Sequence, residues 1–232
     1  MSALPAEPID HRVRVAEARR AAMRERLIDA TMAAYAAGDP TGHPVVDDVI
    51  RHAGVSRGSF YKHFDAVDAV FAVIGQRMAQ EMLVSYSQLV APLQDSAARV
   101  ALGPLMALTR AAMEPRHGAF IARVDFFDFL SSDRPRTRLV AMSLQDGRQH
   151  GTLDFNSIDA AIDLVIGISL EGARRILRTG TLDGAYIREL TGMVLRGLGA
   201  PPADADLAVG LAWRRLVEAS DTLHWWKPVS PA

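Results

Sequence analysis

Residues 45–64, with the sequence VVDDVIRHAGVSRGSFYKHF, constrain the fold of this chain more than any other stretch. Apolar residues recur at helical spacing in its first half. Gly54 ends that pattern, and glycine tolerates the positive φ angle that a tight turn often needs. Ser56 is a residue type that caps helix N-termini, and Phe60 and Phe64 share one face of the helix that follows. The stretch therefore predicts two short helices joined by a tight turn.

The second of these helices is rich in hydrogen-bond donors and has no acidic residue. Donors and acceptors on a narrow helix can read base edges in the DNA major groove, where Arg is the commonest reader of guanine. A donor-rich helix propped on another helix across a turn is the helix-turn-helix arrangement. The predicted DNA-contact residues, one of them on the first helix, are Arg51, Ser56, Arg57, Gly58, Ser59, Tyr61, Lys62 and His63.

Residues 53–56, 58–61 and 63–64 resemble the signature of the tetracycline-repressor (TetR) family of bacterial transcription regulators. The tyrosine, the final phenylalanine and their distance from the glycine turn make this resemblance specific. It covers roughly residues 20–75, and the rest of the chain is similar only in its helical layout. Members are most often repressors, so the resemblance implies a repressor that binds a palindromic operator.

The resemblance also implies roles for individual side chains. Arg57 and Ser59 stand where family members touch bases, whereas Tyr61 and His63 match positions that commonly contact phosphates. Lys62 lies between them and suits either purpose. The competing interpretations are a solvated charge for Arg57 and local packing for Tyr61 and His63.

Five positions weaken the match to the family pattern. Valine occupies positions 45 and 46, at one or the other of which the family often has a capping threonine, and position 67, where it usually has lysine. Asp47 and Asp48 suit a helix N-terminus, but they face a polyanion poorly. We therefore expect the motif itself to make fewer phosphate contacts.

Charge is distributed unevenly along the chain. The net charge is −1, yet residues 12–26 contain six Arg and two Glu. Such a cluster suits the phosphate backbone or a minor groove, and it is expected to compensate for the phosphate contacts missing from the motif. A solvated, Arg-rich helix end is the competing interpretation.

The whole chain is expected to be all-α, with an N-terminal three-helix helix-turn-helix domain and a larger C-terminal helical domain for ligand binding and dimerisation. Neither an alternating strand pattern nor a fixed-period repeat is evident. The expected divisions are a disordered lead at 1–9, the DNA-binding domain at 10–65, the effector-binding and dimerisation domain at 66–226 and a tail at 227–232. Outside the motif, the expected helices span 10–37, 66–90, 95–113, 116–131, 135–150, 156–178, 183–198 and 203–223.

The family resemblance implies a small-molecule effector in the C-terminal domain. Aromatic and methionine side chains at helical spacing fit an apolar lining, although each of them also fits a plain core position. We expect a small apolar or aromatic ligand. The candidate lining residues are Met106, Met113, Phe120, Val124, Phe127, Met142 and Trp213, with Asp125 and Asp128 placed to orient a polar or cationic group.

The resemblance further implies a homodimer formed by helices 156–178 and 183–198. The first of these is rich in aliphatic residues and contains Gly167 and Gly172. A mid-helix glycine costs about 0.5–1 kcal/mol relative to alanine, so close packing against another helix is the expected reason for both. An intramolecular core helix is the competing interpretation.

Several classes of protein are disfavoured. The chain has no Cys, hence no disulfide framework and no thiolate nucleophile, and it lacks the common catalytic motifs. We therefore expect no enzyme activity, no cofactor and no metal site. There is no apolar run of membrane-spanning length and no secretory signal, so we expect a cytoplasmic protein without a membrane partner. The competing functions are a helical interaction module and a motif-less helical enzyme, neither of which binds DNA.

Overall fold

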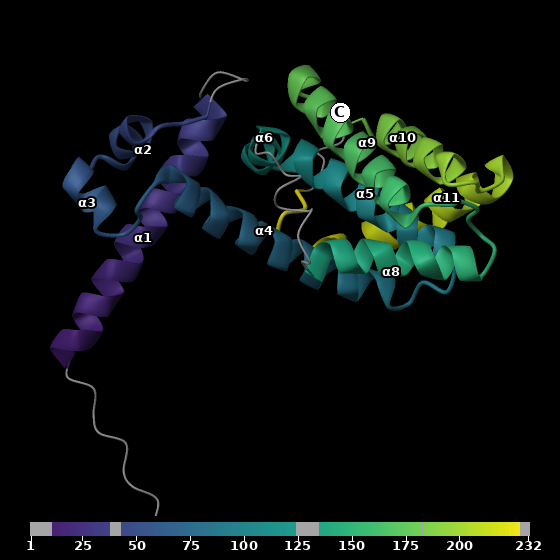
Figure 1. Cartoon of the computed structure of the whole chain (residues 1–232), viewed down its shortest axis with the longest axis horizontal. Helices are drawn as coiled ribbons and strands as arrows, with labels where there is room; N and C mark the ends of the chain where they lie inside the picture. Colours follow the sequence, from purple (N-terminus) through teal and green to yellow (C-terminus); the bar gives the residue numbers. More distant parts are fainter. Residues whose placement is uncertain (1–10, 38–42, 124–134, 182, 228–232) are drawn as a thin grey trace, which may run out of the picture. The chain divides into compact units, whose positions relative to one another are not determined.

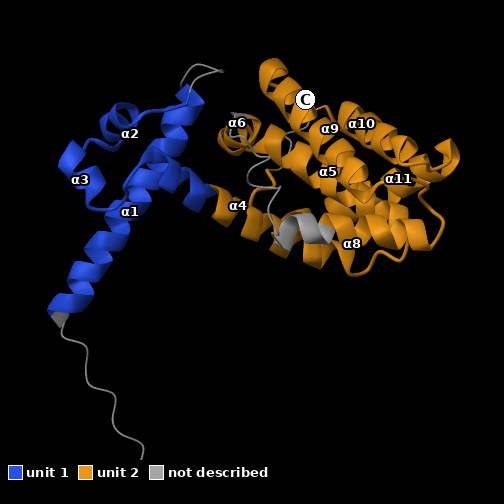
Figure 2. Ribbon diagram, in the orientation of Figure 1, with its two compact units in different colours: residues 1–74 blue, residues 75–232 orange. Residues whose placement is uncertain are grey.

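The computed structural model describes residues 11–37, 43–123, 135–181 and 183–227. Over these residues it contains α-helices, one short 3₁₀ helix and no strand, which confirms the all-α prediction. The chain forms two compact units, residues 1–74 and residues 75–232 (Figure 2). None of the helices in the described ranges is long and apolar enough to cross a membrane.

Unit 1 consists of three helices and the first residues of a fourth (Figure 1). They are α1 (His11–Ala37), α2 (Val46–Ala53), α3 (Arg57–Tyr61) and α4 (Val67–Val90). The predicted back face of the motif is confirmed, because Phe60 and Phe64 are both buried. They belong to a small apolar core that also includes Leu27, Tyr35, Val49, Val70, Phe71 and Ile74.

The turn between α2 and α3 has the predicted stereochemistry. Gly54 has a φ of 62° in the left-handed region, and the N–H of Val55 donates to the Ile50 carbonyl at 3.1 Å. This pattern closes the end of a helix around a left-handed residue. The Ser56 hydroxyl accepts from the N–H of Ser59 at 3.2 Å and caps α3. The turn and its cap are therefore fixed by local backbone chemistry.

Unit 2 is built around α5 (Ser96–Met113), in which 14 of the 18 residues are buried. This helix is central because it packs against five others, and Figure 1 shows their succession along the chain. They are α6 (Pro115–Arg123), α8 (Pro135–Gln149), α9 (Ile158–Thr179), α10 (Gly184–Gly197) and α11 (Pro202–Glu218).

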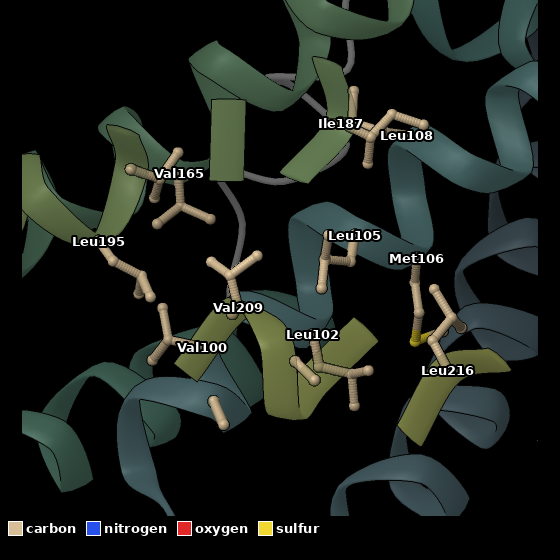
Figure 3. Packing of buried hydrophobic residues seen from close by; sticks show 14 of the residues in the cluster. Val100, Leu102, Leu105, Met106, Leu108, Val165, Ile187, Leu195, Val209 and Leu216 are labelled. Atoms are coloured by element: carbon tan, nitrogen blue, oxygen red, sulfur yellow. The ribbon is translucent and has the colours of Figure 1, made fainter. Parts of the chain in front are cut away.

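The core of unit 2 is formed by aliphatic side chains from α5, α9, α10 and α11 (Figure 3). Leu102 and Leu105 of α5 are fully buried among residues such as Val165, Ile187 and Leu216. Full burial of one such side chain contributes about 1.5–3 kcal/mol. The central helix is thus held mainly by apolar contacts on most of its circumference.

Tyr86 of α4 connects three helices of unit 2. Its hydroxyl donates to the Arg99 carbonyl of α5 at 2.8 Å and lies 2.9 Å from the Ser143 hydroxyl of α8. Burial raises the pKa of Tyr86 above its ordinary value, because the phenolate would lose its hydration. The neutral hydroxyl therefore serves as a fixed link between these helices.

Two glycines of α9 have different surroundings. A Cβ added at Gly172 would lie 2.6 Å from Leu190 Cδ2 and 2.8 Å from Leu108 Cδ2, whereas one added at Gly167 would meet nothing within 4 Å. The predicted close packing is therefore confirmed within the chain for Gly172. Within the described residues, no neighbour lies close enough to Gly167 to require a glycine there.

Two predicted helices have different limits. The helix expected at 116–131 begins at Pro115 as α6 and is described as far as Arg123, so the rest of the prediction lies outside the described residues. The helix expected at 203–223 ends at Glu218 and is followed by the 3₁₀ helix Ser220–Thr222. The segment after it folds back into unit 2, where Trp225 is almost fully buried.

Candidate nucleic-acid interface

The predicted DNA-contact residues all reach the surface of unit 1. Phe60 anchors α3 from behind, so the other sides of this short helix are left for contacts with a partner. Ser59 and His63 are half-buried. The remaining residues of the predicted set are exposed, namely Arg51, Ser56, Arg57, Gly58, Tyr61 and Lys62.

Arg57, the first residue of α3, forms an ion pair with Asp47 in the first turn of α2. Its Nη2 donates to Asp47 Oδ1 at 2.6 Å, and both side chains are more than half exposed. The hydrogen bond and the charge of Asp47 raise the pKa of Arg57 above its ordinary value. The guanidinium is therefore held at the surface by Asp47, a contact that the sequence did not predict.

Asp48 caps the start of α2, where the family often has a threonine. The hydrogen bond runs the other way from a threonine cap, because here a side chain of the helix accepts from the N-cap residue. Val45, the N-cap residue of α2, has no side-chain acceptor, but its N–H donates to Asp48 Oδ2 at 3.0 Å. The other carboxylate oxygen accepts from Arg51 Nη2 at 3.0 Å. The Val45 hydrogen bond, followed by Arg51, lowers the pKa of Asp48 below its ordinary value. Asp48 thus stabilises the start of α2 and neutralises a predicted phosphate contact.

Arg24 of α1 has a structural role that the sequence did not indicate. Its Nη1 donates to the His63 carbonyl at 3.0 Å, and its guanidinium carbon lies 4.1 Å from the centre of the Phe64 ring. Cation–π contact and the hydrogen bond together brace the end of the motif. Arg24 therefore holds the motif to α1, a role that neither interpretation of the arginine cluster included.

The surroundings of Tyr61 are compatible with both interpretations that the sequence left open, phosphate contact and local packing. Its ring packs edge-on against Phe60 with centroids 5.5 Å apart, yet the residue remains 50% exposed. Lys62 is exposed where α3 ends, and the His63 N–H donates to the Phe60 carbonyl at 2.9 Å. Tyr61 and Lys62 thus carry the exposed surface to the end of α3, and the half-buried His63 follows them.

No protein-family model and no curated protein matches this chain. Solved structures do match. RolR in complex with the ligand resorcinol is 18% identical with a TM-score of 0.60, covering 82% of this chain and 94% of RolR. A gamma-butyrolactone receptor, an ArpA-like protein, is 19% identical with a TM-score of 0.58, covering 86% of this chain and 98% of the receptor. A TetR-family transcriptional regulator from Pectobacterium atrosepticum is 19% identical with a TM-score of 0.52, covering 78% and 96%.

The chain has the TetR fold. The likeness extends over most of its length, whereas the motif resemblance reached only roughly residues 20–75. The predicted TetR resemblance is therefore confirmed at the level of the fold.

The effector residues predicted for the TetR fold have unequal surroundings. Met106, Met113 and Phe120 are buried in unit 2, a position that suits either a lining or a plain core. Met142 is 59% exposed, so it does not line an enclosed site in this structure. Trp213 is half-buried at the edge of the core. The predictions for Val124, Asp125, Phe127 and Asp128 lie outside the described residues.

Arg110 is a buried charge that the sequence did not predict. Arg110 of α5 is only 3% exposed and donates to Glu81 of α4 at 2.6 Å and to Glu114 at 2.8 Å. Its guanidinium carbon also lies 5.9 Å from the Trp225 ring centre. The spacing of four residues to Glu114 was the available signal. This pair of salt bridges links α4 to the end of α5 within unit 2.

Proposed function

We propose that this chain is a sequence-specific DNA-binding transcription regulator, a repressor that binds a palindromic operator as a homodimer. The observation that carries the proposal is the α2–Gly54–α3 arrangement, in which an anchored short helix presents exposed donors. The proposed DNA-binding domain is residues 10–65, and residues 66–226 form the effector-binding and dimerisation domain. Such a regulator works in the cytoplasm, where bacterial DNA is found.

Base reading is assigned to Arg57 and Ser59 at the start of α3. A helix in the major groove contacts base edges mainly with its N-terminal residues, and both side chains lie in its first turn. Tyr61, Lys62 and His63 are placed toward its end and would contact phosphates, which fix the register of the protein on the duplex.

A second copy of the chain is needed because one short helix reads too few base pairs for useful specificity. Helix-turn-helix dimers read two half-sites about one helical turn, or a multiple of it, apart. We place the dimer contact on α9 and α10. Two neighbouring residues of α9 support this choice, because Ile166 is only half-buried and Gly167 has open space beside it.

The same two helices also contribute to the core of their own chain. Their inner residues are therefore not available to a partner, although the sequence alone offered them for the interface. These residues, all at least nine-tenths buried, are Val165, Leu170, Ile176, Ile187 and Val194, with Leu198 directly after α10.

The proposed effector is a small apolar or aromatic molecule bound in unit 2. The proteins of the same fold include RolR, whose structure holds resorcinol, and a gamma-butyrolactone receptor. Both names refer to small organic molecules, which supports an effector of this size for the present chain. Met106, Met113 and Phe120 are the residues of the predicted lining that are buried here.

The test is a binding selection with random duplexes, followed by fluorescence anisotropy on the selected sequence. We expect a palindromic site, binding by two chains in sedimentation analysis, and a loss of selectivity in Arg57→Ala. A thermal-shift screen of small phenols and lactones would then seek the effector. Folded dimers that bind every duplex equally, or none at low salt, would refute the proposal and favour a helical interaction module.

A further inference from the structure

We infer that Asp47 positions the Arg57 guanidinium for base recognition, so that the pair rather than the arginine alone sets the base preference of α3. This inference rests on the proposed DNA-binding function. It assigns a role to a residue that the sequence pattern marks as unfavourable beside DNA.

The pair joins the two helices of the motif at their exposed surface. Asp47 lies in the first turn of α2, Arg57 is the first residue of α3, and 2.6 Å separates Asp47 Oδ1 from Arg57 Nη2. Both helices are held from behind, because Val49 and Phe60 are fully buried. The carboxylate therefore stands at a fixed place relative to the backbone of Arg57.

Stabilisation of the fold does not explain this contact. The side chains of Arg57 and Asp47 are 59% and 57% exposed, and exposed ion pairs contribute little to stability. An orientation role explains it better, since a free arginine loses side-chain entropy when it binds. A guanidinium that is already held in one direction loses less.

The geometry leaves enough donors for base reading. An arginine has five N–H donors, and Asp47 is the only hydrogen-bond partner of Arg57 within the described residues. The remaining donors suffice for a bidentate contact with guanine N7 and O6. Holding one edge of the guanidinium with a carboxylate directs another edge outward.

Asp47 is also suited to a clean test. Asp48 beside it caps α2 through Val45, so its removal would disturb the helix as well as Arg51. The Asp47 carboxylate, by contrast, has Arg57 as its hydrogen-bond partner in this part of the chain. Asp29, exposed on α1 of the same unit and outside any ion pair of the described residues, offers a control with the same change of charge.

Asp47→Asn should change affinity and selectivity in opposite directions. Removing a negative charge should tighten binding to every duplex, because the carboxylate no longer repels the phosphates. Discrimination at one base pair of each half-site should fall by about 3- to 10-fold, a part of what a bidentate arginine contact provides. Asp29→Asn should reproduce only the general gain, and Asp47→Glu should retain most of the discrimination.

The experiment measures anisotropy titrations on the selected duplex and on its single-base-pair variants. It uses the full-length wild type, Asp47→Asn, Asp47→Glu, Asp29→Asn, Arg57→Ala and the double variant Asp47→Asn with Arg57→Ala. In the double variant, the loss of Asp47 should have no further effect on base preference, as a double-mutant cycle requires of coupled residues. Circular dichroism checks that each variant is folded.

Two results would overturn the inference while leaving the DNA-binding function intact. One is an unchanged base preference in Asp47→Asn. The other is a preference that still shifts with Asp47 when Arg57 is absent, which would make the carboxylate itself the reader. A wild-type protein with no base preference would instead refute the proposed function, so the two failures are distinguishable.

Discussion

Gly54 and Gly58 allow the fold of the motif to be separated from its recognition of DNA. Gly54 has a φ of 62° between the two helices, whereas Gly58 lies within α3 and is exposed. We predict that Gly54→Ala lowers the stability of unit 1 without altering base preference. Gly58→Ala should raise the stability of unit 1 and alter base preference, because it places a methyl group on the surface assigned to the groove.

The structure sets the size of both effects. An alanine at position 54 would occupy the left-handed region at a cost of about 1–2 kcal/mol. Its Cβ would lie 3.2 Å from Arg26 Nη2, the mobile end of a long side chain, so steric strain adds little. An alanine at position 58 would meet its nearest atom, Ser56 Oγ, at 4.0 Å, and should gain about 0.5–1 kcal/mol from helix preference.

Native-state hydrogen exchange read by mass spectrometry measures these changes in unit 1 directly. A loss of 1.4 kcal/mol corresponds to about tenfold faster exchange through unfolding of the unit. Tryptophan fluorescence supplies an internal reference, because Trp213, Trp225 and Trp226 all lie in unit 2. Its thermal midpoint should therefore be nearly the same in both variants.

Faster exchange in Gly58→Ala, or exchange in Gly54→Ala as slow as in the wild type, would refute this reasoning. The first result would mean that residue 58 is not helical. The second would mean that the turn does not need a left-handed residue. Anisotropy titrations on the selected duplex complete the comparison, and an altered base preference in Gly54→Ala would show that the turn itself takes part in recognition.

Three further predictions concern residues 1–18, the proposed dimer and the effect of pH. Deleting residues 1–18 should reduce the slope of log K against log salt by about 0.9 for each phosphate that these residues neutralise, and an unchanged slope would exclude them from DNA binding. Gly167→Ala should add about 0.5–1 kcal/mol to the stability of its helix yet raise the dimer dissociation constant in sedimentation equilibrium. The matched Gly172→Ala should cost about 1–3 kcal/mol by overpacking. The raised pKa of Tyr86 means that its contribution to stability is present below pH 10 and is lost as pH rises through the folded-state pKa. Tyr86→Phe should flatten this alkaline slope in denaturant titrations and cost about 1 kcal/mol at neutral pH.

The sequence predicted the features of the motif that have local causes. A left-handed glycine, a serine cap and a pair of phenylalanines four residues apart each act over one helical turn, so Gly54, Ser56, Phe60 and Phe64 could be assigned without a structure. The fold class followed from helical periodicity in the same way.

The contacts that the sequence missed join residues whose proximity depends on the turn or on tertiary packing. Asp47 meets Arg57 only because the two helices cross at the turn, ten residues apart in the chain. Arg110 of α5 meets Glu81 of α4, 29 residues away in the chain. The sequence could not separate ligand-lining residues from core residues, because burial of Met106 or Phe120 is expected in a core and around a pocket alike.

On the proposed function, the ion pairs of unit 1 should divide affinity and selectivity for DNA between different parts of the unit. Its described residues hold nine Lys and Arg against seven Asp and Glu, and residues 43–66 hold three of each. Arg51 and Arg57 are already paired with Asp48 and Asp47, which leaves the motif little net attraction for phosphates. General attraction must then come mostly from the exposed arginines in the first half of α1. Salt dependence should therefore follow substitutions of these arginines, while base preference follows the Asp47–Arg57 pair. The two properties should vary independently because separate charges control them.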